Sequence, residues 1–157
     1  MPNWCANSVE FRHDDPAQIE RMKTAFLAER LFSEFVPNPN GPDAEDWYAH
    51  NIAFWGTKWD TGGSDISALE SNMICLVFDT AWSPPVEFYR ALEEQGWTID
   101  GSFYEPGMSF VGSYSTELGE QTYTIPDNLD DVLDEIPPEL DECWGISENW
   151  PEEEDDV

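Results

Sequence analysis

Strand-like and helix-like spacings of hydrophobic residues alternate along the first half of the chain. Residues 5–12 (CANSVEFR) alternate apolar and polar positions, as a β-strand with one buried face does. Residues 14–16 (DDP) then supply a cap and a first-turn proline for a helix, which apolar residues at helical spacing continue to about residue 31. A loop rich in Pro and Asn follows at 35–41, and residues 43–49 are expected to form a short helix.

The middle of the chain predicts further strands with one helix between them. Residues 66–69 and 73–80 are predicted strands, and the almost continuously apolar MICLVF run of the second places it inside the sheet. A helix is predicted from the two prolines at 84 and 85 to about residue 95, with Ser83 as its candidate N-cap. The last predicted strands, separated by a turn with Pro and Gly, are 97–104 and 108–115.

This order predicts an α+β fold. The expected architecture is a ferredoxin-like sandwich, in which two helices cover one face of an antiparallel sheet, over residues 1–123. The chain has 157 residues, enough to bury one hydrophobic core. Its aromatic content of 14% is too high for a disordered acidic chain. We therefore expect a folded core ahead of the acidic end of the chain.

The character of the sequence changes after residue 123. Residues 127–136 predict a short helix with one apolar and one acidic side, which two prolines end. The apolar side consists of Leu129, Val132, Leu133 and Ile136. We expect an acidic helical extension over 124–150 and a disordered acidic tail over 151–157 (PEEEDDV).

The charge is extreme and unevenly distributed. The formal net charge is −28, and Arg90 is the last basic residue. Residues 91–157 contain 20 Asp and Glu, of which 14 lie in 127–157. Such acidity excludes ordinary DNA or RNA binding, because that binding depends on Lys and Arg neutralising phosphates. A partner with a basic surface, cation binding or adaptation to high salt remain as explanations.

The cysteines and the hydropathy profile predict a cytoplasmic protein. Cys5, Cys75 and Cys143 are widely spaced and form no C-x-x-C pair, so neither a zinc site nor a disulfide framework is expected. Cys5 and Cys75 lie in predicted strands and are expected to be buried, inert thiols. The N-terminal segment has no signal-peptide pattern, and no apolar run is long enough to cross a membrane. No cofactor is implied.

Residues 55–60 (WGTKWD) are the most distinctive segment. A lysine between two indoles is suited to a cation–π contact, and such a loop predicts either a ligand pocket or a fold-specific loop whose indoles join the core. The candidate pocket residues are His50, Trp55, Lys58, Trp59, Asp60 and Trp82. His50 with Lys58 and Asp60 is the one candidate acid/base group. No phosphate loop, nucleophile motif or metal-ligand pair accompanies it.

Four segments resemble the YubB-type ferredoxin-like domain family of phages and conjugative plasmids. They are MPNWCAN at 1–7, WGTKWD at 55–60, TAWSPP at 80–85 and YEPGMSFVG at 104–112, in the family's order. The resemblance implies a ferredoxin-like fold and an origin on a mobile genetic element, with the host cell's cytoplasm as the compartment. It implies no catalytic residue, and the acidic extension lies outside these segments.

These observations favour a non-enzymatic protein that binds a basic host protein. The leading hypothesis is a nucleic-acid mimic that inhibits a host defence nuclease or an RNA-guided effector, as anti-restriction and anti-CRISPR proteins do. The carboxylates expected to bind the partner are Asp127, Asp130, Asp131, Asp134, Glu135, Glu139, Asp141 and Glu142. A solvated acidic face is the structural alternative. The alternative function is a small-ligand-binding or catalytic domain built around residues 55–60.

Overall fold

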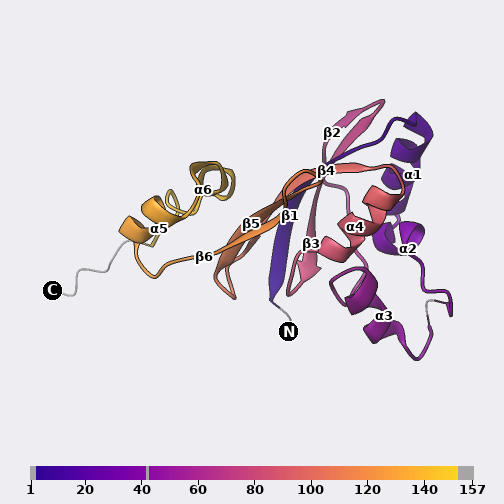
Figure 1. The fold of residues 1–157 in the computed structure, drawn as a ribbon, viewed down its shortest axis with the longest axis horizontal. Coiled ribbons are helices and arrows are strands. Elements are labelled where there is room, and N and C mark those ends of the chain that lie inside the picture. The colour runs from indigo at the N-terminus through magenta and orange to yellow at the C-terminus, as the bar shows by residue number, and fades with distance from the viewer. Residues whose placement is uncertain (1–2, 42, 152–157) are drawn as a thin grey trace.

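A six-stranded antiparallel sheet organises the part of the chain that the computed structural model describes, residues 3–41 and 43–151 (Figure 1). The strands are β1 (Trp4–Arg12), β2 (Ile66–Glu70), β3 (Met73–Ala81), β4 (Thr98–Glu105), β5 (Phe110–Ser115) and β6 (Gly119–Thr124). Their order across the sheet is β2-β3-β1-β4-β5-β6. The helices are α1 (Pro16–Leu27), α2 (Leu31–Phe35), α3 (Trp47–Phe54), α4 (Val86–Glu94), α5 (Leu129–Glu135) and α6 (Pro138–Trp144). The predicted α+β class is confirmed.

Local signals place the first helix correctly but not its end. The Asp15 carboxylate accepts a hydrogen bond from the Ala17 amide at the start of α1, as a capping residue does. The helix predicted to continue to about residue 31 stops at Leu27, and α2 is a separate helix. The chain reverses at Glu29, which has a φ of 59°, and the backbone of Gly62 packs directly against that residue. The contact with a distant loop therefore determines where α1 ends.

Two other predicted helix starts are wrong. The short helix lies at Trp47–Phe54 rather than at residues 43–49. Ser83 does not cap α4, because its hydroxyl donates a hydrogen bond to the Gly56 carbonyl at 2.7 Å. Pro85 occupies the N-cap position of α4 and provides no side-chain hydrogen bond. This hydrogen bond instead connects the WGTKWD loop to the segment just before α4.

The sheet is larger than predicted, because β6 adds a strand at the edge beyond β5. Residues 119–124 (GEQTYT) pair with β5 along their whole length, from Gly119 opposite Ser115 to Thr124 opposite Phe110. Most of their side chains are exposed, so the strand has no clear hydrophobic alternation. A six-stranded sheet also exceeds the four strands of a ferredoxin-like sandwich.

Two hydrophobic clusters lie on opposite faces of the sheet. The larger cluster lies beneath α1, α2 and α4, and the smaller one joins Val111 to α5 and α6. Val111 and Tyr114 of β5 belong to different clusters, and side chains three positions apart on a strand point to opposite faces. The expected two-helix face is instead a face with three helices, because α2 places Leu31, Phe32 and Phe35 in the larger cluster. Figure 1 shows α5 and α6 beyond the β5–β6 end of the sheet, away from α1–α4.

Candidate functional site

The acidic residues predicted to bind a partner form an exposed surface on α5 and α6, hereafter the acidic face. Seven of the eight predicted carboxylates are exposed: Asp127, Asp130, Asp131, Asp134, Glu135, Glu139 and Glu142. Within the described residues, every ion pair lies between residues 10 and 90, so no Lys or Arg neutralises this face. The predicted acidic tail at 151–157 lies outside the described residues apart from Pro151.

Two of the predicted carboxylates have structural roles. The Asp141 carboxylate is half-buried and accepts hydrogen bonds from the amide and the hydroxyl of Ser147, each at 2.7 Å. It thereby closes the turn after α6. Asn128 caps α5 by accepting from the Asp131 amide at 2.9 Å, and its own amide donates to one Asp131 oxygen at 2.8 Å. Asp141 is therefore a stabilising residue. The Asn128 side chain contacts only one of the two Asp131 carboxylate oxygens.

The acidic face is anchored to the sheet by buried apolar side chains. Val132 and Ile136 of the α5 segment and Leu140 of α6 pack on Val111 of β5. The apolar side predicted for the α5 segment is only half covered, because Leu129 and Leu133 are 37% and 58% exposed. The smaller cluster extends under one flank of α5 only. These two exposed leucines consequently lie among the carboxylates.

The WGTKWD loop forms a hollow of about 420 Å³ with α3. Trp55 is buried, and its indole N–H donates to the Val36 carbonyl at 2.8 Å. The predicted cation–π contact is present, with the Lys58 ammonium 4.2 Å from the ring centre of Trp59. Trp47 and Asn51 complete the hollow from α3. Neither residue was among the predicted pocket residues, and Asn51 was expected after the end of the helix rather than within it.

Asp60 belongs to this loop, but its carboxylate binds backbone amides of the fold. Its carboxylate accepts hydrogen bonds from the amides of Phe32 at 2.7 Å, Ser33 at 3.0 Å and Thr61 at 2.8 Å. It therefore satisfies the free amides at the start of α2, a capping role that comes from 28 residues further along the chain. Trp82 is 44% exposed, and it lines neither this hollow nor the one that holds His50.

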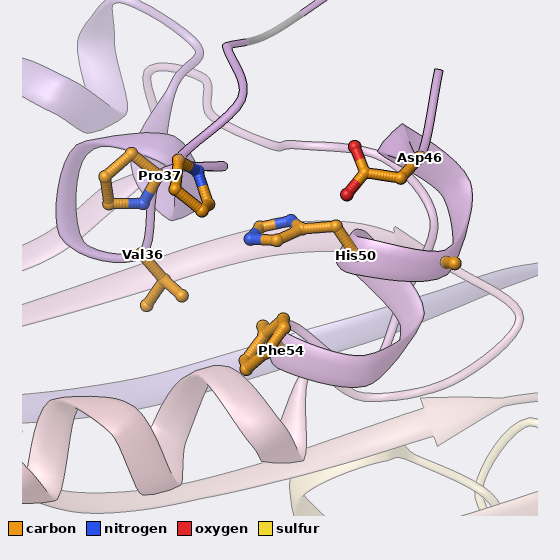
Figure 2. A pocket seen from close by; sticks show the side chains of 7 residues that line it. Val36, Pro37, Asp46, His50 and Phe54 are labelled. Carbon is orange, nitrogen blue, oxygen red and sulfur yellow. The ribbon is translucent and has the colours of Figure 1, made fainter. Parts of the chain in front are cut away.

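His50 does not join Lys58 and Asp60. It is buried in a neighbouring hollow of about 560 Å³, which Figure 2 shows between α3 and the segment after α2. Asn51 lies between the two hollows, since its side chain contacts the His50 ring at 3.1 Å and the Lys58 carbonyl at 2.7 Å. The acid/base group considered from the sequence is therefore not assembled.

The three cysteines occupy different environments. Cys5 is buried as predicted, and desolvation together with the nearby Glu105 carboxylate raises its pKa to about 12. Cys75 was expected to be buried but is only half-buried, and this partial burial raises its pKa. Cys143 on α6 is exposed. The Cys5 thiol is thus kept protonated, which makes it a poor nucleophile.

Comparisons with known proteins identify no relative. No family model, no curated protein and no solved structure matches the chain. Within residues 3–41 and 43–151, no three His, Cys, Asp or Glu side chains gather as a metal site. No helix of this part of the chain combines the length and the apolar character needed to span a membrane.

Proposed function

We propose that this protein is a non-enzymatic binding protein whose acidic face docks on the basic, nucleic-acid-binding surface of another protein. The observation that carries the proposal is the group of seven exposed carboxylates on and beside two helices, none of which forms an ion pair within the described part of the chain. The packing of α5 and α6 on β5 through Val132, Ile136 and Leu140 supports it, because carboxylates held on folded helices match a fixed pattern of cations better than a flexible tail does.

The electrostatics favour a cationic partner. Asp130 and Asp134 are four residues apart on α5, as are Asp131 and Glu135, and like charges at this spacing destabilise a helix by about 0.2–0.5 kcal/mol per pair. A surface rich in Lys and Arg relieves this repulsion and is attracted over several ångströms before contact. The exposed Leu129 and Leu133 add apolar contact area within the acidic face.

The proposed target class is a host defence protein with a Lys/Arg channel, such as a restriction nuclease or an RNA-guided effector. The resemblance to phage and plasmid proteins supports this class, as does the charge. A ferredoxin-like core made of β2-β3-β1-β4 with α1 and α4 is consistent with the observed strand order. In that interpretation β5, β6, α5 and α6 extend the core and carry the binding surface.

The test compares two variants with equal net charge. One carries Asn or Gln at all seven exposed acids of the acidic face. The control carries the same number of substitutions at exposed acids elsewhere: Asp14, Glu20, Glu29, Asp43, Asp65, Glu70 and Glu117. Each protein captures partners from host lysate at low salt, and captured proteins are eluted with rising salt or with competing DNA and RNA.

Wild type and control should retain nucleic-acid-binding proteins that are released by salt and by nucleic acid, whereas the acidic-face variant should not. Equal capture by the acidic-face variant and the wild type would refute the proposal. Loss in both variants would show that net charge, rather than this face, attracts the partner.

A second candidate function is small-ligand binding in the hollow of the WGTKWD loop. Its volume of about 420 Å³ and its three indoles, Trp47, Trp55 and Trp59, are typical of a site for a flat apolar molecule. Trp59→Ala should then abolish ligand binding while the fold is kept, and neutralising the acidic face should leave binding unchanged. Ligand-induced quenching of tryptophan fluorescence measures both effects.

A further inference from the structure

The hollow that contains His50 combines apolar walls with two polar groups. The apolar walls are formed by Val36, Pro37, Pro39, Ala49 and Phe54. Figure 2 shows the His50 ring pointing from α3 into the space beside Pro37, with the carboxylate of Asp46 on one side of the ring and Phe54 on the other. Among the residues that the structure describes, neither a Lys nor an Arg lines the hollow.

The hydrogen bonds of Asn51 determine which His50 nitrogen faces the hollow as an acceptor. The Asn51 amide nitrogen donates to the Lys58 carbonyl at 2.7 Å, so its oxygen is the atom that faces the Nδ1 of His50 at 3.1 Å. An amide oxygen only accepts, so Nδ1 carries the proton and the Nε2 of the neutral ring carries a lone pair. His50 is 6% exposed, and its Nε2 has no hydrogen-bond partner within the described part of the chain.

Asp46 supplies a second acceptor with a negative charge. Its carboxylate is oriented by the side-chain amides of Asn38 at 3.1 Å and Asn40 at 3.3 Å. The hydrogen bond from Asn38, followed by that from Asn40, lowers the pKa of Asp46, so the carboxylate is ionised at neutral pH. The polar groups of the hollow are therefore a lone pair and an anion, and both require a donor.

We propose that this hollow binds a primary ammonium group attached to an apolar chain or ring. The ammonium donates to the Nε2 of His50 and to the Asp46 carboxylate, while its carbon atoms pack on Pro37 and Phe54. An anion would be repelled by Asp46 and by the net charge of −28, which concentrates cations around the protein. A free amine and the side chain of a lysine in a peptide share this chemistry, and the experiment below distinguishes them.

The experiment titrates ¹⁵N-labelled protein with three probes. They are 2-phenylethylamine, its neutral counterpart 2-phenylethanol, and a capped lysine amide. The His50 ring nitrogens are followed by NMR, because a new donor at Nε2 moves that resonance even where the fold is unchanged. Asp46→Asn removes the charge while keeping the size, and Glu45→Gln removes the same charge one residue away, at an exposed side chain that does not line the hollow.

At least one amine should cause a saturable shift at Nε2, whereas 2-phenylethanol should bind far more weakly. Asp46→Asn should weaken amine binding by at least about tenfold, and Glu45→Gln should change it by less than about twofold. Tighter binding of 2-phenylethylamine indicates a free amine as the ligand, and tighter binding of the lysine amide indicates a peptide. Absence of a saturable shift with both amines, equal binding of the alcohol, or equal weakening by both variants would overturn the proposal. Because the hollow shares no residue with the acidic face, neither variant tests the binding of a basic partner.

Discussion

The carboxylates on the two faces of the sheet differ in their contacts. Several acids on the first face cap helices or form ion pairs, whereas most acids on the second face do neither. Beneath α1, α2 and α4, nineteen buried hydrophobic residues of the described chain form one cluster, and nearby acids help to hold it together. Asp15 caps α1, Asp60 caps α2, and Glu34 pairs with Arg21 and Arg30. Beneath α5 and α6 the described cluster contains five buried residues, and most of the surrounding acids have no partner.

This difference bears on why the chain is so acidic. Self-repulsion weakens a folded state, and its cost matters most where the core is small. Here seven exposed carboxylates without an ion pair surround the smaller cluster of the described chain, an arrangement unfavourable to stability. Folding therefore does not account for the acidic face, which is what the proposed binding role would explain.

The largest effect is expected in the larger cluster. Phe32 is fully buried, with its ring 4.6 Å from Phe88 and 5.5 Å from Trp55. Phe32→Ala should lower the free energy of unfolding by about 4 kcal/mol, because the lost apolar contact is joined by the cost of a cavity. Urea denaturation followed by tryptophan fluorescence measures this loss. A loss below about 1 kcal/mol would mean that the cluster rearranges to fill the space.

A smaller and more local effect is expected in the second cluster. Ile136 is 3% exposed and packs with Val132 and Val111 under α5. Ile136→Ala should cost about 3 kcal/mol. The loss should mainly free α5 and α6 from β5, since few buried contacts hold these helices. Amide hydrogen exchange should therefore accelerate in residues 129–144 while β1 and β3 remain protected. Equal acceleration in both regions would show that the two clusters unfold as one unit.

A buried thiol of β1 makes the stability of the first region depend on alkaline pH. Cys5 has a pKa of about 12 in the folded protein, against 9.0 for an ordinary cysteine. The folded thiol therefore keeps its proton longer than the unfolded one, and stability falls as pH rises above about 9. At about pH 10.5 this loss amounts to about 2 kcal/mol.

Urea titrations at pH 8 and pH 10.5 measure this slope in the wild type and two variants. Cys5→Ala should flatten it, and Cys143→Ala should not, because Cys143 is exposed on α6. Tyr114, whose pKa burial and the Glu93 carboxylate raise to about 12, contributes a remaining slope in all three proteins. Identical slopes in the wild type and Cys5→Ala would contradict the assignment to Cys5.

The elements of the first region were predictable where the signal is local. The alternation in β1 and the DDP start of α1 each depend on residues adjacent in sequence, and both predictions are confirmed. The end of α1 depends on a contact with Gly62, and the start of α2 depends on Asp60. No pattern within a helix reports such distant contacts. The same reason explains why Ser83 was mistaken for a cap.

The candidate sites were predictable to a similar extent. Exposure of the carboxylates follows from the absence of nearby basic residues in the sequence, because an unpaired charge is costly to bury. The structural role of Asp141 depends on a turn that closes on Ser147, and the exposure of Leu129 and Leu133 depends on how far β5 and α6 cover α5. Both are properties of the tertiary arrangement. The grouping of His50 with Asp60 failed because proximity in sequence does not place side chains in one hollow.

The smallest expected effect is a change in the free energy of unfolding whose sign differs between a paired acid and an unpaired one. Glu34 accepts hydrogen bonds from Arg21, at 3.0 Å, and from Arg30, which lower its pKa. Glu34→Gln should therefore cost about 0.5–1 kcal/mol at pH 7. This contribution exists above the ordinary glutamate pKa of 4.5 and disappears as the pH falls through the lower folded value.

Asp134→Asn should instead stabilise the protein by up to about 0.5 kcal/mol. Asp134 lies near the C-terminal end of α5, where a negative charge is unfavourable, and four residues after Asp130. Urea titrations at low and high salt check both variants, and high salt should shrink both differences because it screens exposed charges. A loss of stability in Asp134→Asn would show that this carboxylate is used in folding. It would then no longer belong with the acids that we assign to a basic partner.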